Sequence, residues 1–125
     1  MDAISSFILK GMSPQLLVAD IRVSIKFYTI QLGFSIDFNY EDFYAGISKD
    51  GFTIHLKSGK TSMDERRNRR ENEHLDLFFS VTDIGKLYQV ISESPIEVTQ
   101  SLRTMPYGKE FYIVDPDGYI IGFLE

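Results

Sequence analysis

The stretch DPDGY at Asp115–Tyr119, followed by the apolar run IIGFL at Ile120–Leu124, determines how this chain is interpreted. Proline and glycine beside two aspartates are typical of a tight turn, and the apolar run is typical of a buried strand. An earlier segment, LVAD at Leu17–Asp20, also has the form of a strand, and it ends in a residue that favours a helix start. Strand, turn and helix signals therefore recur along the chain in a regular order.

The chain contains an internal repeat of about half its length. The segment Val18–Ile21 is echoed by Val81–Ile84, so a strand twice runs into an aspartate and then into a helical pattern. Asp20 and Asp83 are predicted to cap these helices, because a carboxylate accepts hydrogen bonds from the amides of the first turn. The pairs Asp50-Gly51 and Asp117-Gly118 predict hairpins. Each half thus has the order strand, helix and three strands.

This order resembles the glyoxalase/bleomycin-resistance/extradiol-dioxygenase superfamily, also called the vicinal oxygen chelate superfamily. The resemblance implies an α+β fold in which two tandem βαβββ modules form a curved mixed sheet around a cavity. We therefore predict an N-terminal extension at 1–12, a first module at 13–60, a charged linker at 61–73 and a second module at 74–125. Within the linker, the arginine run Arg66–Arg70 has acids on both sides, which favours a solvated face over a site for an anionic ligand.

Composition limits the classes of function. A formal charge of -5 argues against a nucleic-acid partner, and no apolar run has membrane-spanning length. The absence of cysteine excludes disulfides and thiolate chemistry and suits a cytoplasmic protein. The N-terminus lacks the basic start of a signal peptide. We expect a cytoplasmic protein of bacterial type.

Alternation along the strands predicts which side chains share a face. Phe52, Ile54 and Leu56 are assigned to the core, which turns His55 toward the opposite face. In the second module, Leu77 is assigned to the core and Asp76 to the opposite face. Glu110 is expected to be a solvated or paired surface acid, with a role as a base as the alternative.

The resemblance also implies four positions where metal-using relatives place ligands. They fall on Ser13, His55, Asp76 and Gly122, of which only His55 and Asp76 are plausible ligands. A catalytic divalent site needs about three protein ligands, so we expect no metal, no other cofactor and no catalytic residue. The cavity is instead expected to hold a ligand through aromatic walls and a few polar groups. The residues predicted to line it are His55, Asp76, Ser13, Gln15, Phe78, Tyr112, Phe38 and Tyr44.

The sequence therefore favours a non-metal protein that binds a small aromatic or amphipathic molecule, as in the bleomycin-resistance branch, for sequestration or resistance. The alternative is a divalent-metal glyoxalase-like lyase or dioxygenase-like enzyme with an altered ligand set. A structural or regulatory dimer with an empty cavity is a third interpretation. A homodimer is expected by analogy with the family, with modules that pair within a chain or swap between chains.

Overall fold

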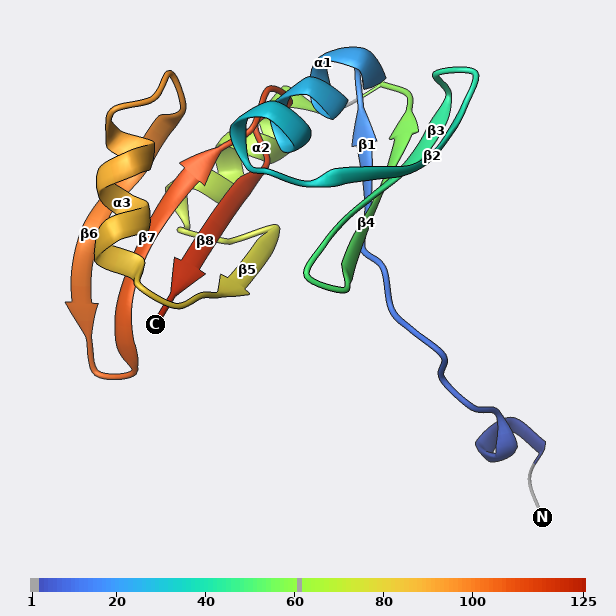
Figure 1. Cartoon of the computed structure of the whole chain (residues 1–125), viewed down its shortest axis with the longest axis horizontal. Coiled ribbons are helices and arrows are strands. Elements are labelled where there is room, and N and C mark those ends of the chain that lie inside the picture. The colour runs from blue at the N-terminus through green and yellow to red at the C-terminus, as the bar shows by residue number, and fades with distance from the viewer. Residues whose placement is uncertain (1–2, 61) are drawn as a thin grey trace. The chain divides into compact units, whose positions relative to one another are not determined.

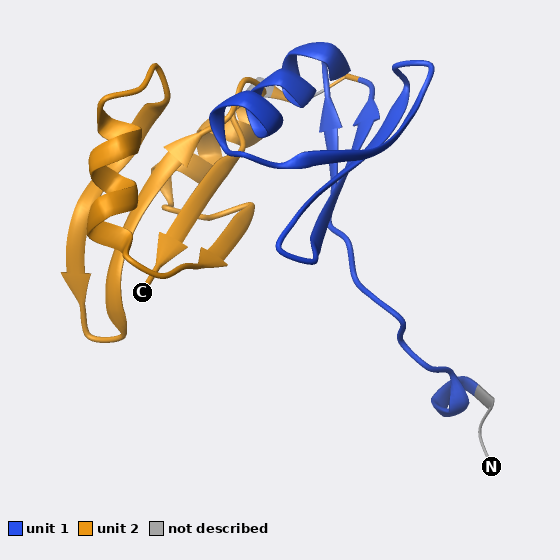
Figure 2. Ribbon diagram, viewed as in Figure 1, with its two compact units in different colours: residues 1–59 blue, residues 60–125 orange. Residues whose placement is uncertain are grey.

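The computed structural model describes residues 3–60 and 62–125, so the first two residues of the expected extension and residue 61 of the expected linker lie outside the described residues. The chain forms two compact units, residues 1–59 and 60–125 (Figure 2). Each unit has one four-stranded mixed sheet, and each follows the order strand, helix, three strands (Figure 1). The predicted α+β class with two βαβββ modules is confirmed.

The first sheet has the strand order β1-β4-β3-β2, with β1 parallel to β4 and the other pairs antiparallel. The first unit consists of η1 (Ala3–Ser6), β1 (Gln15–Val18), α1 (Ile21–Lys26), the π-helical turn η2 (Phe27–Gln31), β2 (Ser35–Tyr40), β3 (Tyr44–Lys49) and β4 (Phe52–Ser58). As predicted, the Asp20 carboxylate caps α1, accepting a hydrogen bond of 3.0 Å from the Arg22 amide. Helix α1 therefore starts where the sequence indicated.

The core of the first unit lies between α1 and one face of the first sheet. Ile54 and Leu56 are buried, as the alternation predicted, and Ile21 and Ile25 of the helix are buried as well. Phe52 is 75% exposed, so its assignment to the core is wrong. It follows the Asp50-Gly51 turn at the very start of β4, and burial along this strand begins only at Ile54.

The second sheet has the order β5-β8-β7-β6, with β5 parallel to β8. The second unit consists of α2 (Met63–Glu71), β5 (Leu77–Ser80), α3 (Ile84–Ser92), β6 (Glu97–Met105), β7 (Gly108–Val114) and β8 (Ile120–Leu124). Its core lies under α3, where the rings of Phe111 and Phe123 stack with centroids 4.9 Å apart. Leu77 is buried in this core, as predicted.

The stretch at 115–119 forms the predicted tight turn between β7 and β8. The buried Asp115 carboxylate accepts hydrogen bonds of 2.9 Å from the amides of both Asp117 and Tyr119. Gly118 adopts a φ of +86°, a conformation that glycine reaches at little cost. The two aspartates and the glycine thus set the return of the chain into β8.

The arginines of α2 are paired with acids. Arg69 contacts Asp76 at 3.0 Å, Arg67 contacts Asp64 at 3.7 Å and Arg70 pairs with Glu97. Arg66 lies 3.8 Å above the ring of Tyr119 in a cation–π contact. The positive charges of the Arg66–Arg70 run are therefore engaged by other residues of the second unit.

No helix of the described residues is long and apolar enough to span a membrane.

The cap of α3 differs from the prediction. Asp83 occupies the N-cap position, but its φ of +56° lies in the left-handed region and its side chain makes no capping bond. The Glu125 carboxylate accepts instead, at 3.1 Å from the Asp83 amide and 2.9 Å from the Ile84 amide. Glu125, which follows β8, therefore caps α3 as Asp20 caps α1.

Replacing Glu125 by Ala is expected to lower the free energy of unfolding by about 1 kcal/mol, the usual cost of losing an N-cap acceptor. Asp83→Asn is the matched control and should change stability by only a few tenths of a kcal/mol, because asparagine tolerates the left-handed conformation. Urea denaturation of both variants measures the difference. A larger loss in Asp83→Asn than in Glu125→Ala would contradict the capping assignment.

Candidate functional site

Each sheet has a back face, defined here as the face turned away from its own helix α1 or α3. The back face of the first sheet carries a cluster of three rings. The rings of Phe38 and Tyr44 are nearly parallel, at 8° with centroids 6.1 Å apart. The His55 ring stands edge-on to both, with centroid distances of 5.4 Å to Phe38 and 5.5 Å to Tyr44. The structure thus brings three of the predicted site residues together.

Hydrogen bonds connect this cluster to the neighbouring strand β1. The Gln15 amide donates to the Tyr44 hydroxyl at 3.0 Å, and that hydroxyl lies 2.9 Å from Nδ1 of His55. Gln15 and His55 are register partners across the parallel pair of β1 and β4, which explains their proximity. Ser13 bonds to Thr53, so its hydroxyl is also engaged on this sheet. Four predicted residues therefore form one connected group, with Ser13 beside it.

Gly46 makes room for the cluster. Phe38 and Gly46 are direct register partners, and a Cβ on Gly46 would lie 2.2 Å from the Phe38 ring. The ring can lie against the β3 backbone only because the side chain is missing there. No pattern in the sequence indicated that this glycine was needed.

On the back face of the second sheet, an aromatic ring likewise lies over a glycine. Phe78 and Gly122 are register partners, and a Cβ on Gly122 would lie 2.9 Å from the Phe78 ring and 2.6 Å from Leu75. Tyr112 pairs with Gly122 on the other side, so Phe78, Gly122 and Tyr112 form a row across three strands. Two further predicted residues thus lie on one face of the second unit.

A buried carboxylate that the sequence analysis misplaced lies next to this row. Glu110 is fully buried (0% exposed), so its assignment to the surface is wrong. It accepts hydrogen bonds from Arg103 at 2.7 and 2.9 Å and from the hydroxyls of Tyr107 and Tyr112 at 2.7 Å each. Arg103 also contacts Glu73 at 3.3 Å. The nearest signal in the sequence is the alternation along β7, which puts Glu110 and Tyr112 on one face.

The network sets the protonation states of its members. Burial alone would raise the pKa of Glu110, but hydrogen bonds from Tyr107, Tyr112 and Arg103 outweigh it and hold the pKa below its ordinary value. Burial, together with the hydrogen bond to Glu110, raises the pKa of Tyr112 to about 12. Glu110 is therefore an ionised, fully occupied acceptor at neutral pH. It is poorly suited to act as a base.

The four positions implied for metal ligands do not fit a metal ion. Asp76 is held by Arg69 through one oxygen and accepts the Ile120 amide at 2.8 Å through the other. Gly122 offers no donor, and Leu75 and Phe78 fill the space where a side chain would project. Ser13 is bonded to Thr53, and His55 uses Nδ1 toward Tyr44. Within residues 3–60 and 62–125 no group of three or more His, Asp or Glu side chains is arranged to hold an ion.

The family follows from comparison with known proteins. A model of the Glyoxalase/Bleomycin resistance protein/Dioxygenase superfamily matches residues 12–123. The chain belongs to this superfamily. The resemblance seen in the sequence is thereby confirmed, although no curated protein matches the sequence.

Solved structures share the fold of this superfamily member. UcmS2 has a TM-score of 0.75 at 16% identity, covering 94% of this chain and 98% of its own. The bleomycin-binding protein from bleomycin-producing Streptomyces verticillus, complexed with copper(II)-bleomycin, has a TM-score of 0.66 at 20% identity, covering 94% and 97%. TnmS3, an antibiotic-binding protein from Streptomyces sp. CB03234, has a TM-score of 0.69 at 17% identity, covering 94% and 98%.

The substitution Glu110→Gln should cost about 3 kcal/mol of unfolding free energy at neutral pH, the scale of breaking a buried ion pair. A lowered pKa in the folded state means that the ionised carboxylate stabilises the fold above the ordinary value of 4.5, and that this contribution is lost as the pH falls through the folded pKa. The difference from the wild type should therefore shrink in acid. Urea titrations over a pH series measure it, with the exposed Glu71→Gln as control. A difference that stays constant into acid would contradict the network.

Proposed function

We propose that this superfamily member is a non-metal protein that binds a small, flat aromatic or amphipathic molecule reversibly and leaves it unchanged. The observation that carries the proposal is the cluster of Phe38, Tyr44 and His55 on the back face of the first sheet. Two parallel rings offer stacking surface, and the imidazole and the Gln15 amide offer directional polar contacts. Such a combination suits sequestration or resistance.

Taken by itself, the back face of the second sheet is also proposed to offer ligand contacts. Phe78 and Tyr112 supply further aromatic surface there, and the buried Glu110 keeps the Tyr112 hydroxyl fixed. Asp76 and Ser13 act mainly by holding their own strands, because their polar atoms are already bonded. Side chains that are held in this way lose little conformational freedom when a ligand binds.

Two considerations support binding without metal chemistry. The donor set at Ser13, His55, Asp76 and Gly122 lacks the ligands that would polarise a substrate oxygen. Two proteins of similar fold are a bleomycin-binding protein and an antibiotic-binding protein.

The absence of cysteine also leads us to place the protein in the cytoplasm, which cell fractionation would test.

Flat aromatic antibiotics and metal-free bleomycin are the probes for this proposal. A true ligand at about 100-fold above its Kd should stabilise the fold by about 2.7 kcal/mol and raise the melting temperature accordingly. Substituting His55 by Ala should weaken binding roughly tenfold, since it removes about 1.4 kcal/mol of ring and polar contacts. His74→Ala is the matched control, because that histidine is exposed and lies outside the cluster.

Mass spectrometry of the recovered compound and elemental analysis complete the test. The proposal requires an unchanged compound, binding that EDTA does not alter, and far less than one metal ion per chain. Turnover of the compound would instead establish the enzyme alternative, as would a tightly held ion near one per chain.

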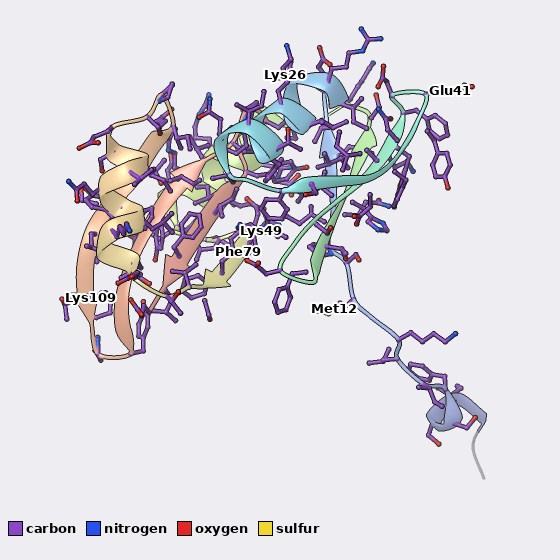
Figure 3. All side chains as sticks on the ribbon, viewed as in Figure 1. Met12, Lys26, Glu41, Lys49, Phe79 and Lys109 are labelled. Atoms are coloured by element: carbon purple, nitrogen blue, oxygen red, sulfur yellow. The ribbon has the colours of Figure 1, made fainter. Side chains whose placement is uncertain are left out.

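A homodimer is the second part of the proposal. The segment before β1 exposes a row of large apolar side chains, namely Ile4, Phe7, Ile8, Leu9 and Met12. Ile8 is 83% and Met12 90% exposed, and Met12 lies on the extended stretch that leads into β1 (Figure 3). Large apolar side chains exposed together in one short segment favour a site of interaction. We assign it to a second copy of the chain, because family members commonly assemble as dimers.

Light scattering at micromolar concentration should give twice the chain mass of 14.4 kDa. The double substitution Ile8→Ser with Leu9→Ser should weaken the dimer by at least about tenfold, since each lost apolar contact is worth about 1.5–3 kcal/mol. Val90→Ser, at a 58% exposed position on α3, is the control and should leave the mass unchanged. A wild-type monomer would contradict this part of the proposal alone.

A further inference from the structure

The hydrogen-bond chain on the back face of the first sheet has a fixed direction. The Gln15 amide nitrogen is a donor only, so the Tyr44 hydroxyl accepts at that contact of 3.0 Å. The hydroxyl has one proton of its own, and His55 Nδ1 lies 2.9 Å away. Donation to Nδ1 uses this proton. The reverse arrangement would leave the phenolic proton without a partner among the residues that the structure describes.

The direction of these hydrogen bonds determines the tautomer of His55. When Nδ1 accepts a hydrogen bond, the ring proton of the neutral imidazole is on Nε2. Nε2 has no hydrogen-bond partner among the described residues. Among the described residues, the side-chain nitrogen and oxygen atoms that are both buried and without a partner are Arg66 Nε and Thr99 Oγ1. His55 Nε2 is not one of them, so this nitrogen is accessible to solvent. His55 therefore presents an unused N–H beside the rings of Phe38 and Tyr44.

The polar surroundings of this N–H also favour an acceptor. Lys57 is exposed two residues along β4, so its ammonium group is on the same face of the sheet as His55. The register partners on this face include Gln15, Tyr44, Gly46, Thr53 and Phe38, none of which is acidic. The carboxylate of Asp37, in the irregular part of β2, accepts the Ser48 hydroxyl of this face at 2.7 Å. Next to the aromatic surface, a ligand thus meets the donors of His55 and Lys57.

We propose that His55 donates its Nε2–H to the bound molecule, so that the site selects planar aromatic compounds that carry a hydrogen-bond acceptor, such as a ring carbonyl. This inference rests on the binding function proposed above and adds the chemical class of the ligand. Tyr44 is a positioning residue in this arrangement, because it fixes the tautomer of His55 through its hydroxyl.

Two matched probes isolate the acceptor. Anthraquinone-2-sulfonate and anthracene-2-sulfonate have the same ring outline and charge, and only the first has ring carbonyls. Calorimetric titration should show that the quinone binds roughly five-fold more tightly, the effect of one net hydrogen bond. In His55→Phe, which keeps a ring but has no N–H, the two affinities should become equal. His74→Gln should retain the preference.

The tautomer is measured without any ligand. The chain has two histidines, so His74→Gln leaves His55 as the single imidazole in a long-range nitrogen–proton NMR spectrum at mildly alkaline pH. The expected species is the Nε2–H tautomer, and adding Tyr44→Phe should give a mixture of both tautomers. An Nδ1–H tautomer would overturn the inference.

The binding outcomes separate the two proposals. Equal binding of both probes by the wild type would overturn the acceptor class but leave the binding function standing. If neither probe nor any compound of the wider panel bound, the binding function itself would fall, and the inference with it. A quinone preference that survived in His55→Phe would also overturn the inference, because His55 would then not be the donor.

Discussion

On the back face of each sheet an aromatic ring lies directly over a glycine of the neighbouring strand. Phe38 covers Gly46 in the first unit and Phe78 covers Gly122 in the second, each pair in direct register. A ring placed this way shields the backbone and lies close to the sheet instead of standing up from it. The orientation of Phe38, in turn, sets its edge-on contact with His55. The aromatic surface of each back face depends on the side chain that is missing at its own glycine.

The two units share a plan but use their polar groups differently. In the first unit the polar residues next to the rings form an open chain that ends at an unused imidazole nitrogen. In the second unit Glu110 gathers Arg103, Tyr107 and Tyr112 into a closed network whose acceptors are occupied. A closed network rigidifies its surroundings, whereas an open chain leaves a group available to a ligand. The repeat has thus diverged into a part suited to recognition and a part suited to support.

The fold could be predicted from the sequence because its main signals are local. The turn at Asp115–Tyr119, the repeated strand-to-helix junction and the alternation along β4 depend on neighbouring residues only. The failures involve distant partners. Asp83 looks like a cap, but whether it acts as one depends on where Glu125 arrives. The burial of Glu110 depends on Arg103, which is brought opposite it through an irregular pairing of β6 with β7. Neither relation can be inferred from residues that are neighbours in the sequence.

The packing around Gly122 has a consequence for how members of this superfamily can exchange functions. A chain with an acid at this position would have to move Leu75 and Phe78 together, because both occupy the space of its Cβ. Asp76 would also have to give up Arg69 and the Ile120 amide before it could serve as a ligand. A single substitution at 122 would therefore yield a strained protein and not a working metal centre. Introducing a side chain at this position would therefore require several concerted changes, because Leu75 and Phe78 already fill the space beside Gly122.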